Sequence, residues 1–368
     1  MSAPSQRSTV SFAVQGANVG RDGTFDHTTY DWYKIPVPRI AAGPAQNQQT
    51  MPLELGGTIT PRGAFKAGYF SGGEIDLIPR LENSIGWMLL AAMGSASSVT
   101  GVNADGVAAS GVNTHIFAFD PSDQSSLPYC AIRRTIPAEE VANDLGESLF
   151  DMKINLLRFT VPNAGKIAMR MQMLGRDYSH ENDFSDWAYA NATFEDHTTT
   201  PEAGYGAFYI NQEEWPIFGL TLDIGNGLTT PAMETVVGDP RPDDFICLTR
   251  AATLRLVLKW DDSELYQQVL NGSASGENWS WTPFEHLTSA NGYALDGRFQ
   301  AAELIGATNT PHEVRVRANR VLWSMAEPPE LVAGGLVQVT FVGTIMQPDT
   351  GNYLEVVVMN AETGYVLP

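Results

Sequence analysis

The sequence predicts a mainly β protein made of two tandem β-sandwich or barrel modules, each flanked by a short α-helix. Three observations support this fold class: the composition, strands with strictly alternating side chains, and an order of elements that occurs twice. Of 368 residues, 43% are hydrophobic and only 17% charged, with 34 Gly and 22 Pro. This balance suits many strands joined by turns better than long charged helices, and the length suggests about two domains.

The clearest strand signal is the stretch GKIAMRMQMLG, residues 165–175. Its side chains alternate with a period of two, which is the repeat of a β-strand. The apolar face consists of Ile167, Met169, Met171 and Met173. Together with the alternating run before it, this strand predicts a hairpin over residues 150–175 whose apolar face covers a core.

A strand followed by a short helix occurs twice. Residues 74–94 predict a strand and then a helix that ends at Gly94. Residues 252–272 repeat this order at an offset of about 179, and their helix ends at Gly272. The predicted helix caps are Asn83 or Ser84 in the first unit, and Asp261, Asp262 or Ser263 in the second.

The hairpin also recurs, over residues 312–343. In this alignment Ile154 corresponds to Val316, and the second strands end at Gly175 and Gly343. Two hairpins and two strand–helix units in one order predict an internal duplication; the alternative is two unrelated β domains with similar periodicity. The predicted boundaries are an N-terminal arm and docking loop at 1–50, a first module at 51–185 and a second module at 186–368.

Residues 13–50 are predicted to be irregular, because Gly, Pro, Asn and Gln interrupt them throughout. An aromatic group, Tyr30, Trp32 and Tyr33, lies in their middle. Such side chains favour burial, so we expect an arm that docks on a surface; the alternative is a free linker.

The chain has 42 acidic and 22 basic residues, a net charge of -20. Binding of nucleic acid through phosphates needs clustered Lys and Arg, so the composition argues against that class. An acidic surface indicates either simple solubility or a surface that repels DNA beside it, and charge alone does not choose. Cys130 and Cys247 are expected to be reduced. Since no leader-like segment and no long apolar run occur, we expect no membrane span.

No catalytic or metal-binding motif is present in the sequence. The six His residues show neither an H-E-x-x-H spacing nor a partnering Cys-x-x-Cys. His180 lies among acidic residues at 177–186, but their order does not match a calcium loop, so we expect a solvated interdomain loop there. We therefore predict no enzyme, no cofactor and no metal site, although a pair of hydrolytic acids could occur among the 42.

The order of these elements resembles the tail tube proteins of long-tailed, siphovirus-type phages. The resemblance covers most of residues 50–368, and is carried by three stretches: residues 72–94, 114–175 and 313–365. The last contains a closing N-A-x-x-x-Y segment, from Asn360 to Tyr365. The resemblance implies β-sandwiches whose sheets join between subunits into a barrel around a lumen. In a tandem variant of the family, three chains close the ring that six single modules would make.

The function implied is a virion structural protein that forms stacked trimeric, pseudo-hexameric rings, a tail tube for viral DNA. Implied partners are other copies of the chain, a tape-measure protein in the lumen, and tube terminator and distal tail proteins. The protein would be made in the host cytoplasm and would let DNA pass without specific binding. Alternatives are another tail component, such as a tube terminator or distal ring, or a hydrolase. A further alternative is an extracellular carbohydrate-binding protein that uses Trp187, Tyr189, Trp279, Trp281 and Tyr293.

The two hairpins supply the candidate ring or lumen residues, and we expect the lumen wall to be net acidic. Because Arg170 is basic, an outer surface or a subunit contact suits it better than the lumen. The ring or lumen candidates are Lys153, Asn155, Arg170, Gln172, Arg315, Arg317, Gln338 and Thr340. The candidates for an arm that bridges stacked rings are Tyr30, Trp32 and Tyr33.

Overall fold

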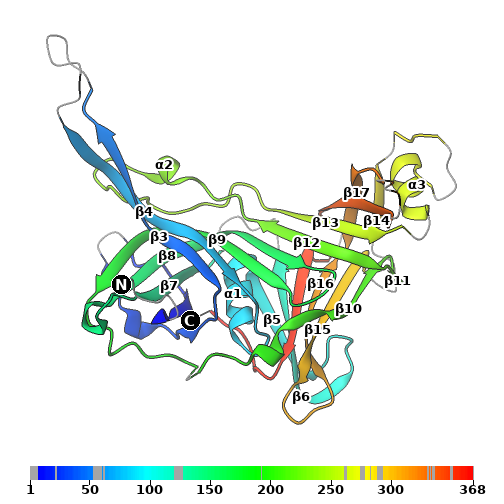
Figure 1. The fold of residues 1–368 in the computed structure, drawn as a ribbon, viewed down its shortest axis with the longest axis horizontal. Coiled ribbons are helices and arrows are strands. Elements are labelled where there is room, and N and C mark those ends of the chain that lie inside the picture. Colours follow the sequence, from blue (N-terminus) through cyan, green and yellow to red (C-terminus); the bar gives the residue numbers. More distant parts are fainter. Residues whose placement is uncertain are drawn as a thin grey trace.

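The computed structural model is mainly β, as predicted, and its strands form two large antiparallel sheets (Figure 1). It describes residues 7–367 except 21–22, 53–59, 61–62, 120–126, 192, 261–262, 274–277, 282, 288–292, 330, 332, 334–335 and 349–350. The helices are α1 (Ser84–Met93), α2 (Pro231–Glu234) and α3 (Glu264–Asn271), with short 3-10 turns η2 (His27–Thr29), η3 (Val141–Asn143) and η4 (His197–Thr199).

Within the described residues, the larger sheet has twelve strands and the smaller has seven. The twelve are β1 (Val10–Gln15), β2 (Tyr33–Lys34), β3 (Arg39–Thr50), β4 (Ala64–Leu77), β7 (Tyr129–Ile136), β8 (Leu145–Val161), β9 (Ala168–Glu181), β12 (Ile217–Gly225), β13 (Ala251–Lys259), β14 (Phe284–Leu287), β17 (Arg320–Glu327) and β18 (Gln338–Ile345). The seven are β5 (Gly94–Val102), β6 (Ala108–Phe119), β10 (Pro201–Ile210), β11 (Glu213–Glu214), β15 (Leu295–Leu304), β16 (Pro311–Ala318) and β19 (Leu354–Asn360).

Eight strands of the larger sheet follow one another in the order β3–β4–β9–β8–β12–β13–β18–β17. We call this set the eight-strand ladder. Its first four strands and its last four have the same antiparallel order, and α1 follows β4 as α3 follows β13. The predicted hairpin over residues 150–175 and the helix ends at Gly94 and Gly272 are confirmed, and a second hairpin forms from β17 and β18, without the residues of β16 that the prediction of 312–343 included. The duplication itself stays a proposal.

One side of the ladder faces the apolar core. The four apolar side chains of β9 and the preceding turn, Ile167, Met169, Met171 and Met173, are all buried there, as predicted. Both predicted glycines lie where a Cβ would collide with a side chain of the adjacent strand, Met152 beside Gly175 and Val321 beside Gly343. The strands do not end at these glycines, however, since β9 and β18 continue beyond them.

The predicted match of Ile154 with Val316 is wrong. Val316 lies in β16, which belongs to the seven-stranded sheet, whereas the hairpin partner of β18 is β17. The chain passes from one sheet to the other at Asn319, between these two strands. The apolar alternation shifts by one residue at this bend, from Val316 and Ala318 to Val321 and Trp323, and such a shift alone does not distinguish a change of sheet from a bulge within one strand.

The expectation that residues 13–50 are irregular is wrong for 13–15 and 33–34, which belong to β1 and β2, and above all for 39–50. These polar residues form β3, paired with β4 from Arg39 opposite Asp76 to Thr50 opposite Ala64. Backbone hydrogen bonds to β4 hold this strand, and it has no apolar face. Its composition therefore does not predict a strand. In Figure 1 the β3–β4 hairpin extends well beyond the body of the molecule.

Helix α1 is buried on nearly all sides, and the closing segment after β19 covers it. The Tyr365 ring lies against Trp87 and His115, with centroid distances of 5.2 and 4.8 Å. Its hydroxyl donates to the Asn83 carbonyl at 3.0 Å, and the Asn360 amide donates to that hydroxyl at 2.8 Å. The conspicuous Asn and Tyr of the closing segment therefore clamp the C-terminus onto the first helix.

Substitution of Gly86 tests this clamp, because a Cβ on Gly86 would overlap the Tyr365 ring. Gly86→Ala should lower the free energy of unfolding by about 2–3 kcal/mol, despite the better helix propensity of Ala. Urea denaturation measures the change. Gly204→Ala is the control, since a Cβ there meets nothing within 4 Å, and an equal effect of both changes would contradict the packing described.

The buried Glu195 carboxylate holds the start of α1 in place of a capping side chain from Asn83. It accepts from the Ser84 amide and hydroxyl at 2.7 Å each, yet burial outweighs these bonds and raises the pKa of Glu195 to about 7. The protonated Glu195 therefore contributes fully to the free energy of unfolding below pH 4.5, the ordinary pKa of the group. This contribution is lost as the pH rises through 7.

Glu195→Gln should therefore become relatively more stable with rising pH. The variant cannot ionise, so the difference in unfolding free energy should shift in its favour by roughly 3 kcal/mol from pH 4.5 to above pH 7. Denaturant titrations at several pH values measure this. Parallel pH profiles of the two proteins would contradict the buried, protonated Glu195.

Candidate assembly surface

The face of the ladder turned away from the core carries paired charges. The Arg170 Nε donates to Asp76 at 2.5 Å, which lowers the pKa of Asp76, and Arg39 reaches the same carboxylate at 3.1 Å. Next to them, Gln172 donates to Glu74 at 2.7 Å. Each partner lies on an adjacent strand, which is the usual geometry of cross-strand pairs.

Similar pairs continue into the second half of the ladder. Arg158 on β8 binds both carboxylate oxygens of Asp223 on β12, at 2.5 and 2.7 Å. Arg255 contacts Glu327 at 2.6 Å, and the Thr340 hydroxyl donates to the same carboxylate at 3.2 Å. The guanidinium groups of this face therefore sit beside carboxylates, so their charge is already balanced within the chain.

Four of the predicted ring or lumen residues lie on this face of the ladder. Arg170 and Gln172 are on β9, and Gln338 and Thr340 are on β18. Of the other four, Lys153 and Asn155 lie on β8 within the ladder but are covered, and two lie in the other sheet. The Lys153 ammonium is buried against Asp244 at 2.9 Å, and Asn155 accepts from the Leu228 amide at 2.9 Å. Arg315 and Arg317 lie on β16 in the seven-stranded sheet.

Lys153 lies opposite Leu174 of β9, on the same face of the ladder as Arg170, and it is buried because the segment with Asp244 and Phe245 covers it. The pairing of β8 with β9 slips between Ile154 and Leu156, so the alternation changes phase at Asn155. After this shift Arg158, which the sequence did not single out, lies opposite Arg170 on the same face as Lys153. Only the partner strand reveals such a bulge, because the sequence alternates plausibly on either side of it.

The aromatic residues of the N-terminal region dock on the chain itself. Trp32 is buried, its Nε1 donates to the His27 carbonyl at 2.7 Å, and its ring stacks on Arg133. Tyr33 stacks on Trp87 and Tyr30 stacks on Phe25, with centroids 5.8 and 5.7 Å apart. Trp32 is therefore packed inside its own subunit and is not exposed for a contact with another chain. Tyr30 and Tyr33 are half-exposed.

Arg133 joins this region to the segment between the two halves. Its guanidinium lies 4.4 Å from the ring of Trp32, 4.8 Å from Trp187 and 4.7 Å from Tyr189. Burial lowers the pKa of Arg133 to about 10. Two of the five aromatic residues considered for sugar binding, Trp187 and Tyr189, thus pack on an arginine.

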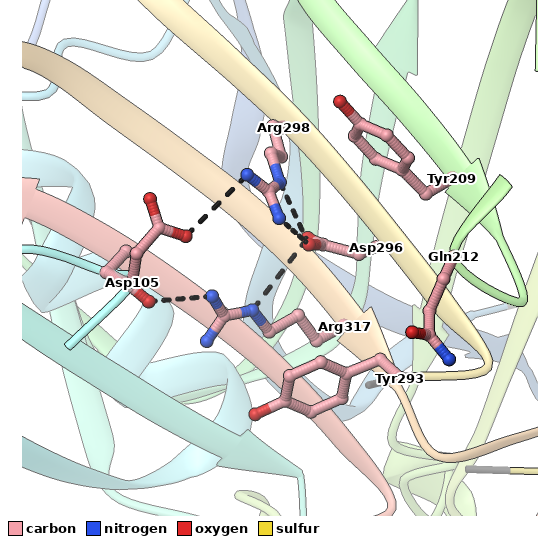
Figure 2. Close-up of a pocket in the computed structure, with 8 residues that line it drawn as sticks. Asp105, Tyr209, Gln212, Tyr293, Asp296, Arg298 and Arg317 are labelled. Atoms are coloured by element: carbon pink, nitrogen blue, oxygen red, sulfur yellow. Dashed lines mark hydrogen bonds and ion pairs between the residues drawn. The ribbon is translucent and has the colours of Figure 1, made fainter. Parts of the chain in front are cut away.

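A pocket in the seven-stranded sheet holds a second set of paired charges (Figure 2). It measures about 560 Å³ and is open to one side. Arg298 pairs with Asp296 at 2.8 Å and lies over Tyr209, while Arg317 lies over Tyr293. Opposite charges face each other here too, so the pocket presents no net charge for a ligand to neutralise.

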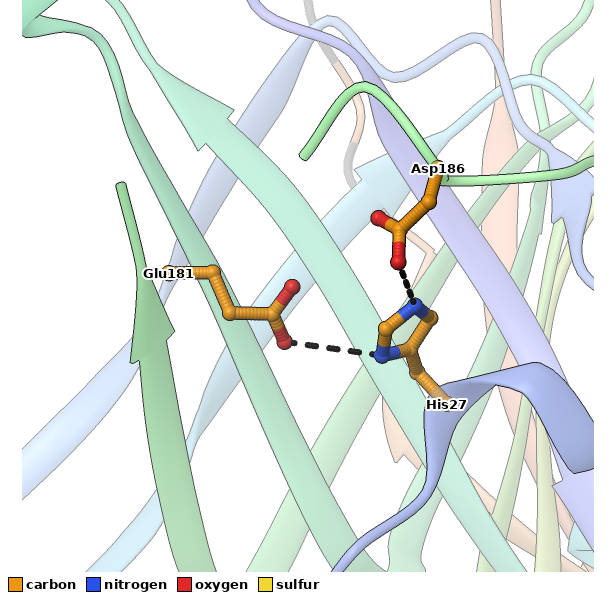
Figure 3. A group of neighbouring side chains, drawn as sticks. All are labelled: His27, Glu181 and Asp186. Carbon is orange, nitrogen blue, oxygen red and sulfur yellow. Dashed lines mark ion pairs between the residues drawn. The ribbon is translucent and has the colours of Figure 1, made fainter. Parts of the chain in front are cut away.

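One group of side chains in the described residues has the composition of a metal site: His27, Glu181 and Asp186 (Figure 3). The two carboxylates face opposite nitrogens of the His27 ring, at 3.6 and 3.5 Å. A single ion bound to one ring nitrogen would be coordinated by the carboxylate on that side, while the other carboxylate lies on the opposite side of the ring. The geometry therefore suits a His bridging two carboxylates, and Glu181 also accepts from the Trp187 indole at 2.8 Å.

The two ends of the ladder differ. Among the described strands, β3 pairs with β4 alone, so its outer edge is free. The outer edge of β17 is partly covered by the short strand β14. In Figure 1 these two ends lie on opposite sides of the molecule. In the described part of the chain, no helix is long and apolar enough to cross a bilayer.

The phage tail tube protein family matches residues 6–310. The chain belongs to this family. The matched region begins before β1 and ends beyond β15, so it includes the first half of the ladder and strands β12 and β13 of the second half. No curated protein matches the chain. A tail tube protein is a structural component of the virion tail, in agreement with the fold and with the resemblance seen in the sequence.

The stacking around Arg133 gives a stability test. Arg133→Ala should lower the free energy of unfolding by about 3 kcal/mol, because it removes cation–π contacts with three rings and leaves the Ala188 carbonyl without its buried donor. Arg255→Ala, on a half-exposed ion pair, should cost less than about 1 kcal/mol. Denaturant unfolding compares them, and equal losses would contradict the role of the stack.

Proposed function

We propose that this tail tube protein assembles into stacked rings of three chains, with pseudo-hexameric symmetry, through which viral DNA passes. The observation that supports the proposal is the pairing of β8 with β12, over Leu156–Val161 and Leu220–Gly225. This pairing joins two four-strand units with the same strand order inside one chain. The last strand of one unit therefore meets the first strand of the next.

The same junction, repeated between chains, would close a ring. The ladder has β17 at one edge and β3 at the other. In strand order, β17 corresponds to β8 and β3 corresponds to β12. A head-to-tail contact of this kind closes when its rotation divides a full turn. Closure into a barrel also removes the exposed edges that make an open sheet prone to aggregation. Three chains supply the six units of a pseudo-hexamer.

The polar face of the ladder is then the face toward the lumen, since the opposite face is buried in the core. Its guanidinium groups are held by Asp76, Asp223 and Glu327, so phosphates of passing DNA find few unpaired cations there. This assigns Arg170 to the lumen instead of the outer surface. A net acidic wall remains our expectation, in line with the charge of -20 per chain.

Contacts between stacked rings would fall to the β3–β4 hairpin, which extends away from the body (Figure 1). This replaces Trp32 as a bridging group, because Trp32 is buried. The tape-measure protein would occupy the lumen, and terminator and distal proteins would meet the two ends of the tube. A tube terminator on the same fold is the remaining alternative, and it would occur in few copies per virion.

The mass and shape of the assembled particle test the proposal. Native mass spectrometry should give rings of three chains, and negative-stain microscopy of the same sample should show six lobes. Rings of six whole chains would contradict the tandem arrangement. A single ring per virion, counted from the intensity of the tail protein on a gel, would favour the terminator.

Removing the carboxylates should make the lumen retain DNA. Asp76→Asn with Asp223→Asn frees Arg170 and Arg158, so tubes of this variant should retard short duplex DNA at low salt and release it as salt rises. Wild-type tubes should not. Asp105→Asn is the control, because its partner Arg315 lies in the other sheet. Equal retention by both variants would contradict the lumen assignment.

A further inference from the structure

The strand β14 occupies an edge that the ring would need. It pairs with β17 over four positions, from Phe284 opposite Trp323 to Leu287 opposite Arg320. Two side-chain contacts strengthen the pairing: Arg320 donates to Glu285 at 2.8 Å, and the Trp323 indole donates to the His286 Nδ1 at 2.9 Å. β14 thus covers the outer edge of β17 in the single chain, on the side away from β18.

The internal junction shows which part of this edge a neighbour would take. The offset of about 179 makes Leu77 and Leu256 equivalent. In the first half, Leu77 lies opposite Met169, and Met169 lies opposite Phe159. In the second half, Leu256 lies opposite Phe341, and Phe341 lies opposite Met325. Phe159 and Met325 therefore hold the same place in their hairpins.

The stretch of β8 that pairs with β12, residues 156–161, then corresponds to residues 322–327 of β17. β14 covers residues 320–323. The two stretches overlap at Leu322 and Trp323. A neighbour that pairs with β17 as β12 pairs with β8 would therefore collide with β14.

The incoming strand is identified by the same registers. Leu222 of β12 lies opposite Leu254, and Ile40 of β3 lies opposite Ile75, the equivalent of Leu254. Since Leu222 faces Phe159 across the internal junction, Ile40 of a second copy would face Met325. β3 has twelve residues and an outer edge that no described strand occupies, so it can offer more pairing than the four residues of β14.

We propose that β14 is a guard strand: it caps β17 in the free subunit and leaves that edge when β3 of a second copy pairs there. This inference rests on the proposed ring. An exposed strand edge can pair with any extended chain. While β14 is bound, only a partner strand with a longer edge in the right register would displace it and pair with β17. The guard would keep free subunits from joining through their sheets out of register.

A disulfide that holds the guard in place tests this directly. Glu285 and Leu322 are directly opposite each other, so Glu285→Cys with Leu322→Cys should form a cross-strand bond on oxidation. The oxidised chain should lose ring formation and recover it on reduction, with thiol titration reporting the bond. Thr253→Cys with Thr344→Cys is the matched control, because this pair joins β13 and β18 inside the ladder, and it should assemble in both redox states.

Ring formation by the oxidised Glu285→Cys, Leu322→Cys chain at the rate of the reduced chain would overturn the guard. Failure of the wild-type chain to form three-chain rings would instead overturn the proposed function, so the two failures are distinguishable. The register has its own test: Ile40→Cys with Met325→Cys should give disulfides between chains in assembled rings. Assembled rings without that cross-link would overturn the proposed pairing of β3 with β17.

Discussion

The pairing of β8 with β12 is the constraint on which the rest of the structure depends. It unites two four-strand units into one continuous ladder, and the Arg158–Asp223 pair fixes the same junction on the polar side. Backbone pairing across a junction requires the two units to share twist and register. In the proposed ring, the two outer edges of the ladder would pair as β8 pairs with β12, so assembly would need no new type of contact.

A second connection holds the halves together on the other sheet. The C-terminal strand β19 pairs with β16 of the second half and with β6 of the first. The segment after it then clamps α1 through Asn360 and Tyr365. The two halves therefore share a core instead of meeting as separate bodies, and α1 is buried far more than α3, in which Leu265 is the buried residue. This unequal packing distinguishes the two halves within an otherwise similar order of strands.

Periodicity in the sequence predicts the elements whose two faces differ in polarity. The Met side of β9, the Leu side of β13 and the glycine-terminated helices all follow this rule and are confirmed. The family resemblance found from the same stretches is confirmed as well. Strand β3 escapes prediction because AAGPAQNQQT has no apolar face and is held by backbone pairing with β4.

The candidate surface was predicted less well, for local reasons. The segment with Asp244 and Phe245 covers Lys153, and the bend at Asn319 places Arg315 and Arg317 in the other sheet. No periodicity predicts the covering segment, and the shift of the alternation at Asn319 does not by itself reveal a change of sheet. Asp76, which pairs with both Arg170 and Arg39, comes from a strand about 90 residues before Arg170, and only the sheet order brings such distant residues together.

A density map of assembled tubes at a resolution that separates strands tests the central claim most directly. The account predicts one unbroken inner barrel, in which the β17 edge of each chain pairs with β3 of the next as β8 pairs with β12 within a chain. Ladders that meet through loops or side chains, with the β3 and β17 edges left unpaired, would contradict it.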